Sequence, residues 1–140
     1  MDTPSIPEFP HFVHETVTRW SDDDRQGVLN NAVYMTLFEE ARLGFSRMTE
    51  ALEGGNFPFL LAQTNVRFLR PGRGGQSVRV EVSTLEVGKS SFRQAYRVRG
   101  ENGDIWSEAE AVLVCFDPKT MESRAIPDDL RGALEALMGD

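Results

Sequence analysis

Cysteine and histidine are nearly absent from this chain of 140 residues. Cys115 is the single cysteine, which excludes an internal disulfide and a cysteine-rich metal cluster. His11 and His14 are the two histidines, and no acidic or thiol residue stands at a recognisable metal-ligand spacing from them, so no metal site is expected. Both lie on one predicted strand, and the sequence has no Gly-x-Ser-x-Gly elbow. Neither a Ser-His-Asp nor a Cys-His site is therefore indicated.

Long apolar runs and nucleotide-binding signatures are missing as well. No hydrophobic stretch approaches the length that spans a bilayer, and there is no Gly-x-Gly-x-x-Gly or phosphate-binding loop. Neither membrane association nor a cofactor is therefore expected. The N-terminal MDTPSIPEFP is acidic and rich in proline, unlike a secretory signal or a transit peptide, which makes the cytoplasm the expected location. A net charge of −7 argues against nucleic acid as a partner.

Positive charge is concentrated between residues 67 and 99, where eight basic residues stand against two acidic ones. This region either binds a phosphorylated small molecule or places its arginines on the outer face of a sheet, and the second interpretation is favoured for any single arginine. The run Gly72-Arg73-Gly74-Gly75 lies between two predicted strands rather than before a helix. That position favours a flexible turn over a phosphate-binding loop.

The pattern of apolar residues predicts one long helix and five strands. Apolar residues recur at helical spacing from about residue 31 to 50, Asn30 or Asn31 can cap the N-terminus of this segment, and no proline interrupts it. Alternating β-branched and aromatic residues, bounded by turn residues, predict the strands. The strands are expected at 11–21, 59–69, 77–87, 90–99 and 105–116, and a short helix at about 127–138.

This order of elements predicts an α+β fold in which an antiparallel sheet wraps around one long helix. Tight turns join the last four strands, and hairpin connections make neighbouring strands antiparallel. Length and a hydrophobic content of 40% fit a single domain over residues 1–140, with residues 1–10 as a loose N-terminal arm. One helix cannot cover both faces and both edges of the sheet, so a homodimer or a homotetramer is expected.

Three consecutive aspartates, Asp22 to Asp24, stand between the first strand and the long helix. They lead into a helix N-terminus, whose unpaired N–H groups and dipole favour negative charge and can hold the oxyanion of an acyl-transfer reaction. An aspartate at this point could attack a carbonyl or activate water. These parts suffice for thioester hydrolysis. The plainer interpretation is an acidic turn before an asparagine-capped helix.

The segment RWSDDDRQGVLNNAVYMTLFEEAR, residues 19–42, resembles the 4-hydroxybenzoyl-CoA thioesterase family. Members of that family have the pattern [RW or RF]-x-D-x-D-x-x-G-H-V-N-N-x-x-Y-x-x-x-F-E-x-A-R, and a dozen positions agree. Weaker similarity covers NVRFLRPG at 65–72, GKSSF at 88–92 and the last strand. The resemblance implies the hotdog fold, hydrolysis of an acyl-CoA, and a site at an interface between subunits.

The resemblance also implies roles for particular residues. The second aspartate of the family's D-x-D is its catalytic carboxylate, and it falls on Asp24. The backbone N–H that polarises the thioester carbonyl in the family falls near Asn31, at the start of the helix. Gly27, which permits a tight turn, belongs with Asn30 and Tyr34 to the active-site loop.

In the family, CoA lies across the outer surface with its phosphates near basic residues. Arg70, Lys89 and Ser90 are the candidates for this contact, by position alone. Two departures from the pattern stand in the active-site turn: Val28 replaces the family's histidine, and Arg25 replaces a small or apolar residue.

Glu39 offers a second catalytic possibility, because a related branch of hotdog thioesterases uses a helix glutamate from the partner subunit. The plainer interpretation, which we favour, is an exposed charge paired with Arg42 one turn further along.

The sequence thus predicts an acyl-CoA thioesterase in which Asp24 is the nucleophile or the general base. The alternative is a noncatalytic protein that binds acyl-CoA or another acyl carrier on the same fold. A hydratase or dehydratase ranks last, because such enzymes rely on a histidine in the active site. The identity of the acyl group stays open: Phe57, Phe59, Leu60 and Leu61 could line a channel or belong to the core.

Overall fold

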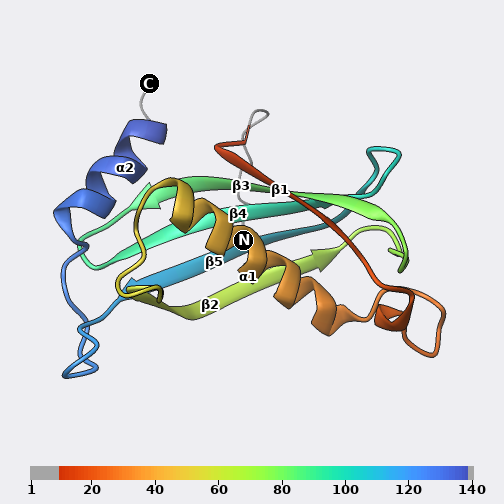
Figure 1. Cartoon of the computed structure of the whole chain (residues 1–140), viewed down its shortest axis with the longest axis horizontal. Coiled ribbons are helices and arrows are strands. Elements are labelled where there is room, and N and C mark those ends of the chain that lie inside the picture. Colours follow the sequence, from red (N-terminus) through yellow and green to blue (C-terminus); the bar gives the residue numbers. More distant parts are fainter. Residues whose placement is uncertain (1–9, 139–140) are drawn as a thin grey trace.

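Five strands, two α-helices and a short 3-10 helix make up residues 10–138, the part of the chain that the computed structural model describes (Figure 1). In chain order they are β1 (Phe12–Val17), η1 (Trp20–Asp22), α1 (Asn31–Met48), β2 (Phe59–Phe68), β3 (Ser77–Val87), β4 (Ser91–Arg99), β5 (Ile105–Cys115) and α2 (Asp128–Met138). The predicted order of elements is confirmed. The first strand is shorter than predicted, because the chain turns into η1 after Val17. Apart from Pro10, the predicted N-terminal arm lies outside the described residues.

The strands form one antiparallel sheet in the order β1-β3-β4-β5-β2. Hairpins join β3 to β4 and β4 to β5, and β2 pairs with β5, so β1 and β2 are the edges. The sheet curls around α1, which runs along its inner face (Figure 1). The predicted fold class, an antiparallel sheet wrapped around one long helix, is confirmed.

The core lies between α1 and the inner face of the sheet. The side-chain oxygen of Asn30 accepts a hydrogen bond of 2.9 Å from the N–H of Ala32 and caps the helix. The buried apolar residues of α1 recur every three or four positions and are Tyr34, Leu37, Phe38, Ala41 and Phe45. Burying one large apolar side chain contributes roughly 1.5–3 kcal/mol, so core packing rather than intrinsic propensity holds this helix in place.

Hydrogen bonds between polar side chains cross this core. Arg42 donates from Nη1 to the hydroxyl of Tyr96 at 3.1 Å, and that hydroxyl donates to Oε1 of Gln94 at 2.7 Å. Gln94 in turn donates from Nε2 to the hydroxyl of Thr84 at 3.3 Å. Burial raises the pKa of Tyr96 to about 12, although Arg42 acts in the opposite direction. The Tyr96 hydroxyl therefore keeps its proton and remains a donor.

Ion pairs occupy the outer face of the sheet. Four arginines pair there with four glutamates: Arg67, Arg93, Arg97 and Arg99 with Glu81, Glu86, Glu108 and Glu110. For these four arginines, the outer-face interpretation of the basic region is correct.

The two ends of the molecule differ. The turn before α1 lies at the right in Figure 1, while α2 and the hairpin between β3 and β4 lie at the left. Arg131 of α2 donates to the carbonyl of Gly88 in that hairpin at 2.6 Å. Within residues 10–138, neither helix has the length and the apolar character needed to cross a bilayer.

Candidate active site

Each of the three consecutive aspartates has its own hydrogen-bond partner. Asp22 accepts from the backbone N–H, Nε and Nη2 of Arg19. Asp23 accepts from the backbone N–H of Gly74 at 2.7 Å, through Oδ1. Asp24 accepts from the N–H of Gln26 at 2.7 Å, also through Oδ1. The three carboxylates thus have three different structural surroundings.

Asp22 stabilises the 3-10 turn. Its carboxylate reaches back to Arg19, the residue that precedes η1, and closes a capping box. Burial alone would raise the pKa of Asp22, but the hydrogen bonds and the charge of Arg19 outweigh burial and hold that pKa below its ordinary value. Asp22 is therefore fixed as an anion that anchors the end of the segment from β1.

Asp24 stands in a tight turn of its own. The turn is closed by backbone bonds from Asp24 N to the Val28 carbonyl at 2.8 Å and from Gly27 N to the Asp24 carbonyl at 3.0 Å. Gly27 has φ of +75°, which a residue with a side chain rarely adopts. The Asp24 side chain is partly exposed, and no donor within residues 10–138 bonds to its Oδ2. One carboxylate oxygen thus orients the side chain, and the other remains available for chemistry.

The first turn of α1 has one N–H group without an acceptor. The N–H of Ala32 donates to the side chain of Asn30, and the N–H of Val33 donates to the Asn30 carbonyl at 2.9 Å. No atom of residues 10–138 accepts from the N–H of Asn31. The chain also folds back onto this helix end, because Asn30 N donates to the Asp22 carbonyl at 2.9 Å. An unpaired N–H at a helix N-terminus is suited to a partly negative oxygen.

A pocket of about 210 Å³ lies at this helix end. Its walls come from the turn (Val28 and Leu29), from α1 (Asn31 and Tyr34), and from residues 68–72 at the end of β2. Apolar side chains dominate them, and the Val28 side chain stands where the sequence pattern has histidine. The pocket is of a size and character that can take a small acyl group.

Tyr34 lines this pocket, and neighbouring residues pack closely around its side chain. Its ring packs edge-on against Phe68 with 5.2 Å between the ring centroids. A Cβ atom on Gly72 would lie 2.7 Å from the Tyr34 hydroxyl and 2.6 Å from the Trp106 ring, so only glycine fits between them. Burial raises the pKa of Tyr34. Its hydroxyl is therefore a neutral wall group.

A larger hollow of about 350 Å³ lies between the end of β1 and α1, on residues that include Thr16, Leu37 and Glu40. The two charged groups at its other end, Arg19 and Asp22, already pair with each other. Asn31 lines the smaller pocket but not this hollow, and Asp24 lines neither of the two. The wall of the smaller pocket continues through Val28 into the turn that holds Asp24, so this pocket is the better candidate for the site of reaction.

The glycine-rich run between β2 and β3 is ordered by contacts with the acidic turn, which the prediction of a flexible turn missed. Gly72 accepts from Leu29 N at 2.9 Å, Gly74 donates to Asp23, and Gly75 donates to the Thr18 carbonyl at 2.7 Å. The sequence drew attention to both segments of this contact, through three adjacent aspartates and through three glycines in four residues. Neither pattern indicated that the two segments contact each other.

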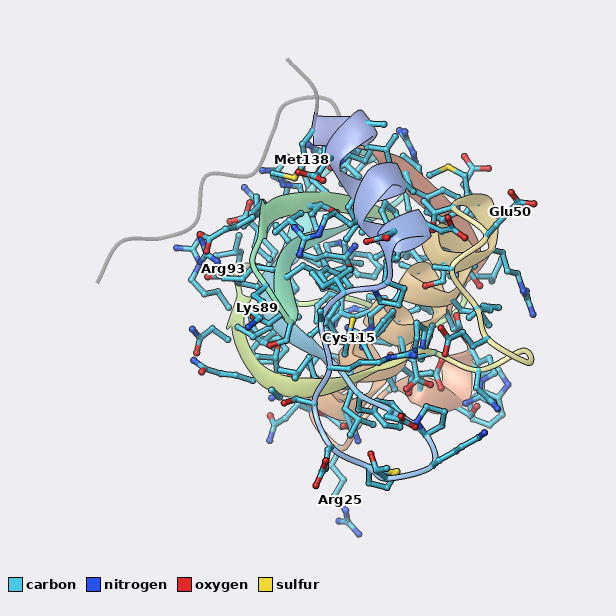
Figure 2. All side chains as sticks on the ribbon, turned by 90° about the vertical axis from the view of Figure 1, so that its left-hand side faces the viewer. Arg25, Glu50, Lys89, Arg93, Cys115 and Met138 are labelled. Carbon is cyan, nitrogen blue, oxygen red and sulfur yellow. The ribbon has the colours of Figure 1, made fainter. Side chains whose placement is uncertain are left out.

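The residues that were predicted to contact CoA lie at opposite ends of the molecule. Arg70 lines the pocket, and its Nη1 lies 3.8 Å from Oδ2 of Asp104. Lys89 and Ser90 lie in the hairpin beside α2, at the end of the sheet that faces the viewer in Figure 2. Within one chain, the structure therefore does not bring Lys89 and Ser90 to Asp24. Arg25, beside Asp24, projects away from the ribbon into solvent (Figure 2).

The favoured pairing of Glu39 with Arg42 is wrong. Glu39 is exposed, whereas Arg42 is 5% exposed and points into the core toward Tyr96. The two residues are near neighbours in the helix but lie on different faces of it. Glu39 thus has no ion-pair partner within residues 10–138.

Comparison with known proteins identifies the family. The model of the thioesterase superfamily matches residues 26–107, more than half of the chain. The chain belongs to the thioesterase superfamily. The matched range includes Asn31 and Tyr34 and begins two residues after Asp24.

Two named proteins and one solved structure are similar to this thioesterase superfamily member. The acyl-CoA thioester hydrolase YbgC of Escherichia coli O6:H1 is 25% identical over 128 residues, which cover 84% of this chain and 96% of that protein. A 1,4-dihydroxy-2-naphthoyl-CoA hydrolase of Synechococcus elongatus is 21% identical over 127 residues, with 86% and 93% coverage. A thioesterase of Thermus thermophilus, solved with coenzyme A and Zn, superimposes with a TM-score of 0.84 and 30% identity, covering 96% of this chain and 99% of that one. The resemblance seen in the sequence is confirmed, and with it the hotdog fold and an enzyme that hydrolyses thioesters.

Proposed function

We propose that this thioesterase hydrolyses acyl-CoA to the free acid and CoA, with Asp24 as the catalytic carboxylate. The unpaired N–H of Asn31 carries the proposal, because Asn31 lines an apolar pocket beside the turn that holds Asp24. The YbgC protein and the naphthoyl-CoA hydrolase are both named for CoA thioesters, which supports the choice of CoA as the leaving group.

The reaction needs a polarised carbonyl and an activated attacking oxygen. With the acyl group in the pocket, the thioester oxygen accepts a hydrogen bond from the Asn31 N–H, which then stabilises the oxyanion. Asp24 either takes a proton from the water that attacks the carbonyl carbon, or attacks that carbon itself through Oδ2. In the second route, water then hydrolyses the mixed anhydride. Both routes expel CoA as a thiolate, which takes up a proton, and both give the same products.

The active unit in this proposal is a homodimer or a homotetramer built through the β2 edge. β2 is the more exposed edge strand, and Leu60, Leu61 and Phe68 on it are 51%, 40% and 48% exposed. Two β2 edges paired antiparallel would place the partner's β3–β4 hairpin at the same end as this chain's acidic turn. Lys89 and Ser90 would then bind CoA from the partner subunit, and Arg70 from this one.

The test compares Asp24→Asn with Asp117→Asn on a panel of short, long and aromatic acyl-CoAs. Asp117 is a matched control, because its Oδ1 accepts from the N–H two residues further on at 2.8 Å, as Asp24 does. We expect Asp24→Asn to lower kcat by about 10²–10⁴ and Asp117→Asn to leave it unchanged. Equal rates for Asp24→Asn and the wild type would exclude Asp24. CoA-ester binding without hydrolysis across the whole panel would favour the noncatalytic alternative.

A further inference from the structure

Backbone hydrogen bonds join residues 72–76 to the segment that carries the acidic turn. Leu29 donates to the Gly72 carbonyl at 2.9 Å, Gly75 donates to the Thr18 carbonyl at 2.7 Å, and Thr18 donates to the Gln76 carbonyl at 2.8 Å. These bonds attach the two ends of the 18–29 segment. The tip of the turn, which holds Asp24, lies between them.

Two side chains extend this contact to the tip, one from each side. Asp23 reaches out of the turn and accepts from the N–H of Gly74 at 2.7 Å. Arg73 reaches into the turn and donates from Nη1 to the carbonyl of Gly27 at 2.8 Å. Asp23 precedes Asp24 directly, and Gly27 closes the same turn three residues later. The two bonds therefore hold the turn on both sides of the carboxylate.

Gly74 makes this contact possible. A Cβ atom at that position would lie 2.1 Å from the carbonyl oxygen of Arg19 and 2.7 Å from the Cα of Trp20. Both neighbours are backbone atoms, which cannot turn aside as a side chain can. The close approach of the two segments thus depends on a glycine at 74, and it presents the Gly74 N–H to Asp23.

We propose that Asp23 and Arg73 are positioning residues, which hold the turn so that the Asp24 carboxylate faces the bound thioester. This inference rests on the proposed role of Asp24. Residues 25–27 of the turn are exposed, while Asp24 and Val28 are half-buried, so the geometry of the turn depends on the bonds that hold it to the rest of the chain. A displacement of about 1 Å of a catalytic group can lower the rate about 10²-fold.

Asp23 acts in this role through its oxygen and not through its charge, because its Oδ1 accepts the N–H of Gly74. Asparagine at position 23 keeps an oxygen that can accept the same N–H and removes the charge, so it separates the bond from the charge.

The structure offers a matched control for each variant. Asp23→Ala is paired with Glu101→Ala, because Glu101 also accepts from a backbone N–H, that of Ser77 at 2.9 Å, but not on the turn. Arg73→Met is paired with Arg99→Met, because Arg99 likewise donates from Nη1 to a glycine carbonyl, that of Gly103 at 2.9 Å. Each control loses the same kind of bond as its partner variant, and Arg99→Met also loses the ion pair with Glu81.

Steady-state kinetics and thermal unfolding of these variants test the proposal. We expect Asp23→Ala and Arg73→Met to lower kcat by about 10- to 100-fold with little change in KM, since the displaced group acts on the bound substrate. Asp23→Asn restores most of kcat, because its amide oxygen can still accept the N–H of Gly74. The two controls keep the wild-type kcat although their melting temperatures fall by at least as much. Wild-type kcat in Asp23→Ala, or equal losses in Glu101→Ala, would overturn the proposal.

Amide hydrogen exchange separates this inference from the proposed function. If Asp23 holds the turn, Asp23→Ala speeds exchange across residues 22–29 and Glu101→Ala does not. This readout needs no turnover. If the wild type hydrolyses no acyl-CoA, the proposed function fails. The exchange rates alone then decide whether Asp23 holds the turn. Unchanged exchange across residues 22–29 in Asp23→Ala overturns it.

Discussion

The guanidinium of Arg42 and the hydroxyl of Tyr96 form a hydrogen bond of 3.1 Å inside the core. The two residues are 5% and 1% exposed, and the Cζ of Arg42 lies 5.3 Å from the centroid of the Tyr96 ring. Among residues 10–138, no carboxylate lies within ion-pair distance of this arginine. A buried cation is thus stabilised by a neutral hydroxyl and by the face of an aromatic ring.

Tyr96→Phe is expected to lower the free energy of unfolding by about 2–3 kcal/mol, because it leaves a buried charged donor without its acceptor. The loss should be smaller in an Arg42→Met background, where no charge remains to be satisfied. Urea denaturation of the four proteins of this double-mutant cycle measures the coupling. An equal loss in both backgrounds would show that the bond contributes nothing.

Asp22 should make the fold sensitive to acid. Its folded-state pKa lies below the ordinary value, because the bonds from Arg19 outweigh the effect of burial. Its contribution to stability is therefore complete above the unfolded pKa, about 3.9, and is lost as the pH falls through the folded pKa. Denaturation curves between pH 6 and pH 2 check this. Asp22→Asn should be less stable than the wild type at pH 6 and should converge with it in acid. A constant difference at every pH would contradict the assignment.

Local patterns were sufficient to predict the fold. Period-two alternation in Val78, Val80 and Val82 and helical spacing from residue 31 reflect burial on one face, which is a property of neighbouring residues. The end of β1 was predicted wrongly, because Trp20 favours extended chain by type. In the structure it lies in η1 and is 83% exposed.

The site was predictable only in part. The helix cap is local, and the sequence limited it to Asn30 or Asn31, of which the structure shows Asn30. The bond from Gly74 to Asp23 joins residues 51 positions apart, and no periodicity or turn signal carries that information. The expected pair of Glu39 with Arg42 failed for a related reason: spacing brings two helix residues near each other, but the core decides which of them turns inward.

Two glycines should respond oppositely to alanine. Gly132 lies on the exposed side of α2, and a Cβ atom added there would meet no atom within 4 Å, so Gly132→Ala should stabilise the protein by about 0.5–1 kcal/mol through helix propensity. Gly74→Ala must displace the backbone at Arg19 and should both destabilise the fold and lower kcat. Thermal unfolding and kinetics of the two variants measure this. An unchanged melting temperature and an unchanged kcat in Gly74→Ala would contradict this prediction. They would show that residues 18–29 and 72–76 can move apart at no cost.

Self-association should depend on the β2 edge and not on the β1 edge. Leu60 on β2 and Val17 on β1 are 51% and 63% exposed, and each lies on a strand with one unpaired side. Lysine on an edge strand opposes pairing with a second edge, because two copies would bring like charges together. Leu60→Lys should therefore shift the mass in solution toward that of one chain, 15.7 kDa, and lower activity with it. Val17→Lys, of similar exposure, should leave both unchanged. Sedimentation or light scattering measures the mass. If Val17→Lys is monomeric while Leu60→Lys still forms an oligomer, the interface lies at β1 instead.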